Sequence, residues 1–162
     1  MQAATSLLTI RSVDAQDPQA LMLLAEAAVE ARALYPDLFA PHAPAPVNAP
    51  LRAREIYLVA CQDGRPLGCG ALHVRDSITG ELRRMFVTRS ARRDGVARAL
   101  LERLEQEALA LGYRRLVLET GKRQEPAIAL YRSCGWRRIA AYGAHVGDPM
   151  SACFGKTLEA PC

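Results

Sequence analysis

The sequence has no long hydrophobic segment and little that marks a secreted or membrane protein. No apolar run in its 162 residues approaches the roughly 20 residues that a transmembrane helix needs. The first residues also lack the basic stretch and the long apolar stretch of a secretory signal peptide. We therefore expect a cytoplasmic protein that does not use a membrane as a partner.

Cysteine and histidine patterns that hold metals are missing as well. The cysteines are odd in number, contain no CxxC pair and have no histidine at zinc-finger spacing: Cys61, Cys69, Cys134, Cys153 and Cys162. This pattern favours a reducing compartment and a chain without a metal. Cys134 could be a catalytic thiol, but an ordinary small buried residue is the favoured interpretation.

Aromatic residues make up only 6% of the chain, and their scarcity limits what its basic surface can bind. Residues 1–63 carry 4 basic and 7 acidic side chains, whereas residues 64–162 carry 17 basic and 10 acidic ones. An anion should therefore dock on the C-terminal part. Because no zinc-finger or RNP-type motif accompanies the basic residues, we expect a compact phosphate ligand and no nucleic-acid partner.

The composition itself is that of a globular protein, with 50% hydrophobic and 23% charged residues. The length suits one hydrophobic core and is too short for two ordinary domains. We expect a single domain over residues 1–162.

Apolar patterns predict seven strands, at residues 7–13, 56–62, 67–74, 81–87, 116–119, 136–139 and 151–158. The second and third strands are separated by AspGlyArgPro, which predicts a hairpin. Helices are expected at residues 18–34, 96–111 and 127–134. Strand, helix and parallel strand from residue 81 to 119 form one right-handed crossover.

Two features of the N-terminal third bear on a binding site. The helix at 18–34 follows an N-cap, Asp17, and has an apolar stripe at three-and-four spacing: Leu21, Leu24, Ala25, Ala28, Val29 and Arg32. Residues 36–50 then contain five of the ten prolines, which rules out a continued helix. This loop either lines a substrate pocket or is a plain surface connector.

The most informative stretch is the basic loop in front of the second helix. Arg92, Gly95 and Ala97 form the motif RxxGxA between an apolar strand and a helix. A helix that begins there presents unpaired backbone N–H groups and the positive end of its dipole. The loop therefore predicts a site for phosphate oxygens.

The order of motifs resembles the GNAT superfamily of acyl-CoA N-acyltransferases. RxxGxA is followed about thirty residues later by AxxLYxxxGW, and the resemblance is sharpest from Glu81 to Trp136. In element order it extends over residues 7–158. It implies an α/β (α+β) fold whose mixed central sheet has about six to seven strands, splays between the fourth and fifth, and carries helices on both faces.

The resemblance also implies where acetyl-CoA binds. The backbone of Met85, Phe86 and Val87 would pair with the pantetheine arm and polarise the thioester carbonyl. The next backbone amides would hold the pyrophosphate. These belong to Arg92, Arg93, Asp94, Gly95, Val96 and Ala97, and the two arginines would add charge-assisted contacts.

Two residues are implied in the chemistry. Tyr131 matches the tyrosine beside the thioester sulfur, whose phenol donates a proton to the departing thiolate. Glu81 stands six residues before Val87, the spacing of the general base in some members, where it takes a proton from the arriving ammonium. Glu119, His73 and His145 are rival bases, and other members use water chains.

Three residues depart from the family pattern. Asp94 places a negative charge inside the phosphate loop, Gln124 replaces a frequent asparagine, and Trp136 replaces the usual phenylalanine or tyrosine. None of these changes removes a required backbone contact. Cofactor binding, with Gln124 at its margin, should therefore persist.

The function implied is an N-acetyltransferase that moves an acetyl group from acetyl-CoA to a primary amine by direct attack. The alternative is a non-catalytic acyl-CoA-binding sensor or interaction module of the same fold. The amine, a small molecule, an amino acid or a peptide, stays open, with Tyr35, Arg52, Arg54 and His145 as candidate contacts for a carboxylate-bearing acceptor. Many members form dimers, so a homodimer is also possible.

Overall fold

A seven-stranded mixed sheet forms the centre of the molecule, in the order β1-β2-β3-β4-β5-β7-β6. The computed structural model describes residues 6–159, so Cys162 and the first five residues of the expected N-terminal region lie outside it. The strands are β1 (Thr9–Val13), β2 (Ile56–Gln62), β3 (Arg65–Val74), β4 (Thr79–Val87), β5 (Arg115–Gly121), β6 (Arg137–Ile139) and β7 (Ser151–Thr157). The helices are α1 (Pro18–Leu34), α2 (Val96–Ala110) and α3 (Glu125–Ser133), with short 3₁₀ turns at Arg89–Ala91 and Gly143–His145.

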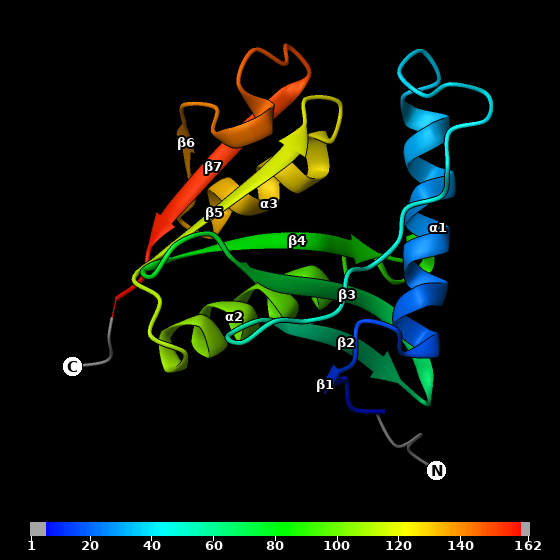
Figure 1. Ribbon diagram of the computed structural model, residues 1–162. Coiled ribbons are helices and arrows are strands. Elements are labelled where there is room, and N and C mark those ends of the chain that lie inside the picture. Colours follow the sequence, from blue (N-terminus) through cyan, green and yellow to red (C-terminus); the bar gives the residue numbers. More distant parts are fainter. Residues whose placement is uncertain (1–5, 160–162) are drawn as a thin grey trace.

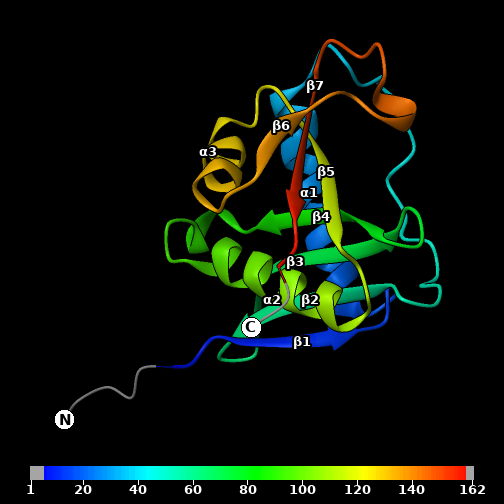
Figure 2. The same cartoon turned by 90° about the vertical axis from the view of Figure 1, so that its left-hand side faces the viewer.

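Helices cover both faces of the sheet because side chains alternate along each strand. In β2, Leu58 and Ala60 pack in the larger core with α2, whereas Tyr57 and Val59 pack in a second core with α1. Figure 2 shows α2 in front of β2–β4 and α1 behind them. Residues of α3 also belong to the larger core, so α2 and α3 share one face.

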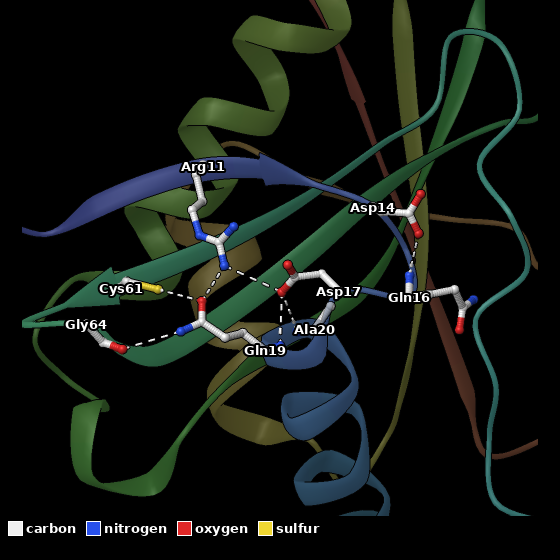
Figure 3. A network of polar contacts seen from close by, with 8 residues as sticks. All are labelled: Arg11, Asp14, Gln16, Asp17, Gln19, Ala20, Cys61 and Gly64. Carbon is white, nitrogen blue, oxygen red and sulfur yellow. Dashed lines mark hydrogen bonds and ion pairs between the residues drawn. The ribbon is translucent and has the colours of Figure 1, made fainter.

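The start of α1 is fixed by its N-cap, as the sequence predicts. The Asp17 carboxylate accepts the backbone N–H of Gln19 at 2.9 Å, and Pro18 occupies the first turn. Gln19 then reaches the carbonyl of Gly64 in the β2–β3 turn at 3.3 Å (Figure 3). The cap thus also ties the helix to the sheet.

The apolar stripe expected on α1 is wrong in part. Leu21 and Val29 are exposed, whereas Leu23 and Leu24 are buried with Ala20. Leu24 belongs to the predicted stripe, and Ala20 and Leu23 do not. The buried face has the same three-and-four spacing, but it begins one position earlier, at Ala20.

Element boundaries differ from the prediction where turns are tighter than expected. The β2–β3 turn consists of Asp63 and Gly64 alone, both at positive φ, as in a two-residue hairpin turn. Arg65 and Pro66 therefore belong to β3, opposite Gln62 and Cys61. The third helix begins at Glu125 rather than Ala127 because Pro126 suits a first turn.

The sheet splits between β4 and β5, which confirms the expected fold class. These parallel strands are paired only from Thr79↔Arg115 to Leu82↔Leu118, although β4 continues to Val87. Within β4, a bulge places two residues opposite one of β3, and Arg84 there has a φ of 62°. Figure 1 shows β5 and β7 turning away from β1–β4. Five residues of β4 thus lack a strand partner on the β5 side.

Candidate active site

The loop before α2 presents a row of unpaired backbone donors. Within the described part of the chain, the N–H groups of residues 93–98 have no acceptor. Two backbone positions in the left-handed region shape the loop, Arg93 with a φ of 69° and Gly95 with a φ of 82° as the N-cap of α2. The helix dipole adds positive potential at this point. The loop therefore offers donors that an anion could accept, and phosphate binding there stays a prediction.

Some side chains of the loop contact neighbouring elements, and others face solvent. Val96, the first residue of α2, is buried in the larger core, and Ala97 packs against the same core. Arg92 is tied back: its Nε donates to the Val87 carbonyl at 3.1 Å, and its guanidinium pairs with Glu30 of α1 at 2.7 Å. It therefore holds the loop against α1. Arg93 and Asp94 are exposed and face solvent with opposite charges.

The free edge of β4 leads straight into this loop. Met85 and Phe86 are half-buried and Val87 is buried. At the end of the strand, the Thr88 hydroxyl is buried without a hydrogen-bond partner among the described residues. A backbone edge, an unpartnered hydroxyl and the N–H row are thus consecutive, which suits an extended ligand with a phosphate end.

Tyr131 lies on the α2 side of the split. It is buried beside Trp136 and Phe154, with ring centroids 6.0 and 6.2 Å away. Burial raises the pKa of Tyr131 to about 12, so the phenol is protonated at neutral pH. Full proton transfer to a thiolate, whose thiol has an ordinary pKa of about 8.5, is then unfavourable. Donation of a hydrogen bond is the role that this environment supports.

Gln124 marks the entrance to α3. It is the N-cap of this helix, yet its side chain makes no capping hydrogen bond and is half-buried. Its backbone N–H donates to the carbonyl of Gly121 at 3.0 Å. The side chain is therefore available at the end of β5.

Glu81 lies on the opposite face of the sheet from Tyr131. Its neighbour Leu82 packs in the core under α2, so Glu81 points to the α1 side. The residue is only 5% exposed. One carboxylate oxygen accepts a hydrogen bond from the Tyr142 hydroxyl at 2.6 Å, and the other pairs with Arg83. Both oxygens of this buried carboxylate are therefore oriented.

The rival base Glu119 lies on the same face, on β5. It accepts a hydrogen bond from Ser151 at 2.9 Å, and Nδ1 of His145 is 3.9 Å from it. The rings of His145 and Tyr142 are in edge contact at 5.3 Å. The segment between β6 and β7 therefore links the two carboxylates.

The other candidate residues have different outcomes. His73 on β3 lies directly opposite Glu81 on β4 in the strand pairing. Its Nδ1 is 3.3 Å from a carboxylate oxygen of Glu55, and burial lowers the pKa of His73. Arg52 also pairs with Glu55. The Arg54 side chain has other partners: its guanidinium stacks on Tyr113 at 4.1 Å, and its Nε donates to the Leu111 carbonyl.

Tyr35 closes the far end of α1 against β5. Its hydroxyl accepts the backbone N–H of Arg123 at 3.0 Å. The Arg123 guanidinium pairs with Asp37 through two hydrogen bonds, of 2.7 and 3.0 Å. Tyr35 therefore joins the two halves of the sheet, and its hydroxyl is engaged.

Sequence reasoning missed Tyr142, Glu30 and Glu55. Tyr142 is 61 positions from its partner Glu81, and Glu30 is 62 positions from Arg92. Glu55 pairs with the nearby Arg52 and with His73 on β3. No local pattern marks them. Only the pairing of β5 with β7 brings the Tyr142 segment over β4.

The candidate residues lie on both faces of one split sheet. The row of free N–H groups and the buried phenol of Tyr131 lie on the α2 side, and the buried carboxylate of Glu81 lies on the α1 side. A donor and an acceptor that enter from opposite faces would meet in the split. This arrangement suits acyl transfer from a phosphate-bearing donor.

Among the described residues, no group of three potential ligands could hold a metal. Within the same part of the chain, the helices are too short or too polar to span a bilayer.

Comparison with known proteins gives the family. The chain belongs to the acetyltransferase (GNAT) family, whose sequence profile matches residues 23–136. It is 43% identical over 103 residues to the IAA acetyltransferase of Azospirillum brasilense, covering 63% of this chain and 67% of that protein. The chain is accordingly an N-acetyltransferase.

Solved structures agree. A Klebsiella pneumoniae protein proposed to be an acyl-CoA N-acyltransferase superposes with a TM-score of 0.77 at 28% identity, over 94% of this chain and 99% of that one. A GNAT acetyltransferase from Elizabethkingia anophelis, solved with acetyl-CoA bound, has a TM-score of 0.66 at 19% identity, over 93% and 98% of the chains.

Proposed function

We propose that this enzyme transfers the acetyl group of acetyl-CoA to a primary amine by direct attack, without a covalent enzyme intermediate. The observation that carries the proposal is the row of free N–H groups at residues 93–98, placed where the split between β4 and β5 opens. The acetyl-CoA bound by the Elizabethkingia relative supports this choice of donor.

The donor would bind along β4 and the loop. The edge at Met85, Phe86 and Val87 would pair with the pantetheine arm as an added strand. The amides from Arg93 to Ala97 would hold the pyrophosphate. The exposed Arg93 would add a positive charge, and Arg92 would hold the loop in place through Val87 and Glu30. Gln124 lies at the neighbouring entrance of α3.

The acceptor would approach from the α1 side. Glu81 takes the proton of the ammonium, the amine nitrogen attacks the acyl carbon, and the C–S bond breaks. The nitrogen gives up its second proton as the amide forms. The thiolate leaves with a hydrogen bond from Tyr131 and takes a proton from solvent, which gives free CoA. Glu119 is the second candidate for the base, since it lies on the same face.

The test is acetyl-CoA-dependent release of free thiol over a panel of amines, amino acids and peptides, combined with calorimetry of CoA binding. Tyr131→Phe keeps the packing on Trp136 and removes only the hydroxyl. We expect kcat to fall by about 10²-fold or more, with CoA affinity nearly unchanged.

Two outcomes would contradict the proposal. Unchanged kcat in Tyr131→Phe would remove this residue from the mechanism. Tight CoA binding without thiol release for any acceptor would favour the sensor alternative, for which the comparisons provide no support.

The proposal also covers the number of domains, the cellular location and the partners of the enzyme. We propose a single domain over residues 1–162, because one sheet includes strands from Thr9 to Thr157. We propose a cytoplasmic location, because Cys61, Cys69, Cys134 and Cys153 are free thiols. Nucleic-acid and membrane partners play no part in the proposal, and a homodimer would be tested by light scattering.

A further inference from the structure

A small cavity lies beside Glu81 on the α1 side of the sheet. Its volume is about 140 Å³, and its walls include Asn48, Tyr57, His73, Arg83 and Arg84. Val47 and Ala49 from the proline-rich loop close it, so this loop does line a pocket. Arg83 also pairs with Glu81, so the cavity adjoins the proposed base.

The hydroxyl of Tyr57 in this wall makes no well-formed hydrogen bond within the described chain. The residue is 1% exposed, and the polar neighbours of its buried oxygen are the side chains of Asn48 and Cys69. Burial also raises the pKa of Tyr57 to about 12, so the hydroxyl is a neutral donor near pH 7. A buried donor without an acceptor costs stability, and a ligand acceptor would remove that cost.

The cationic wall is preorganised. Arg84 is held at the β4 bulge, where its Nε donates to Asn48 Oδ1 at 3.0 Å and its terminal nitrogen donates to the Val47 carbonyl at 3.1 Å. Asn48 is itself held by the Ala15 carbonyl at 2.9 Å. The guanidinium therefore keeps its position at the cavity and has further N–H groups to offer.

Among the described residues, no carboxylate lines the cavity. Glu81 and Glu55 lie behind its wall, where they pair with Arg83 and His73. Two arginines and a neutral donor in the lining suit an anion, and the Glu81 carboxylate beside Arg83 suits a neighbouring amine. The Arg fork suits a planar carboxylate.

We propose that this cavity binds a carboxylate of the acceptor, so that the substrate class is an amine bearing a carboxylate, of which an amino acid is the simplest. Tyr57 and Arg84 contact the carboxylate, and the amine lies toward Glu81. The inference rests on the proposed acetyl transfer and adds its specificity.

The experiment compares amino acids with their neutral amides as acceptors, in the wild type and in Tyr57→Phe. The wild type should prefer the acid by about tenfold or more in kcat/KM, and Tyr57→Phe should reduce that preference by about tenfold, since a hydrogen bond to a charged group is lost. Comparing the acid-to-amide ratio between variants cancels the different basicity of the two amines.

Tyr113→Phe is the matched control. Its hydroxyl donates to the Arg54 carbonyl at 3.0 Å and does not line the cavity. We expect the same acid-to-amide ratio as in the wild type.

The outcomes separate the two proposals. Thiol release that is equal for acids and amides would overturn the carboxylate site and leave the acetyltransferase standing. If no acceptor releases thiol, calorimetry of acid and amide with the CoA-bound protein decides the site directly. Acid-selective binding that Tyr57→Phe weakens would support it, and binding of neither would overturn it.

Discussion

At the scale of the residue, the contact between Tyr142 and Glu81 determines how the proposed base behaves. Burial and the hydrogen bond to Glu81 raise the pKa of Tyr142 well above its usual range, so this phenol is a donor at any physiological pH. In Tyr142→Phe, the carboxylate form of Glu81 loses a hydrogen bond. We expect kcat/KM to fall by about tenfold, because one of the two contacts that orient this carboxylate is lost.

The measurement is kcat and kcat/KM for Tyr142→Phe, Glu81→Gln and the double variant. Glu81→Gln should lower kcat by about 10²-fold or more, and in that background Tyr142→Phe should have little further effect. If Glu119→Gln instead causes the large fall while Glu81→Gln keeps the activity, Glu119 is the base.

At the scale of the element, the loop before α2 depends on a left-handed residue. Gly95 has a φ of 82°, and a Cβ added there would meet no atom within 4 Å, so Gly95→Ala fits the space but strains the backbone. Reorienting this turn would disperse the N–H row. We expect CoA affinity to fall by about tenfold while the strain costs about 1–2 kcal/mol of stability.

Gly64→Ala provides the control for backbone strain alone. Gly64 has a φ of 73° and equally open surroundings, but it lies in the β2–β3 turn. It should lose a similar amount of stability in urea unfolding and keep the CoA affinity measured by calorimetry. Equal loss of affinity in both variants would contradict a specific role for the loop.

At the scale of the whole molecule, the two halves of the sheet are held together by few connections. β4 and β5 share four residue pairs, and Tyr35, Asp37 and Arg123 tie the end of α1 to the end of β5. A ligand in the split would bridge both halves. Saturating acetyl-CoA at about 100 times its Kd should add about 2.7 kcal/mol of stability, or roughly 5–10 °C in Tm.

Differential scanning calorimetry with and without acetyl-CoA measures this shift. Gly95→Ala at the same ligand concentration should show a smaller increase, whereas Gly64→Ala should show the full one. An unchanged Tm in the wild type would contradict binding in the split.

Local signals were sufficient for much of the fold. Asp17 and Pro18 start α1 at the predicted residue, and β2 spans its predicted range, Ile56–Gln62. The motif RxxGxA lies on the predicted turn into α2. The buried face of α1 was the clear failure, because helical periodicity cannot say which side meets a sheet when both sides are rich in alanine and leucine.

The sequence by itself determined the family, the element order and the position of the RxxGxA loop, because caps, turns and motif spacing act within a few residues. Only the tertiary structure decided that Arg92 is a brace, that Tyr142 holds Glu81, and that Tyr57 and Arg84 line a common cavity. These contacts join residues tens of positions apart, and they exist only because strand register and helix packing bring the side chains together.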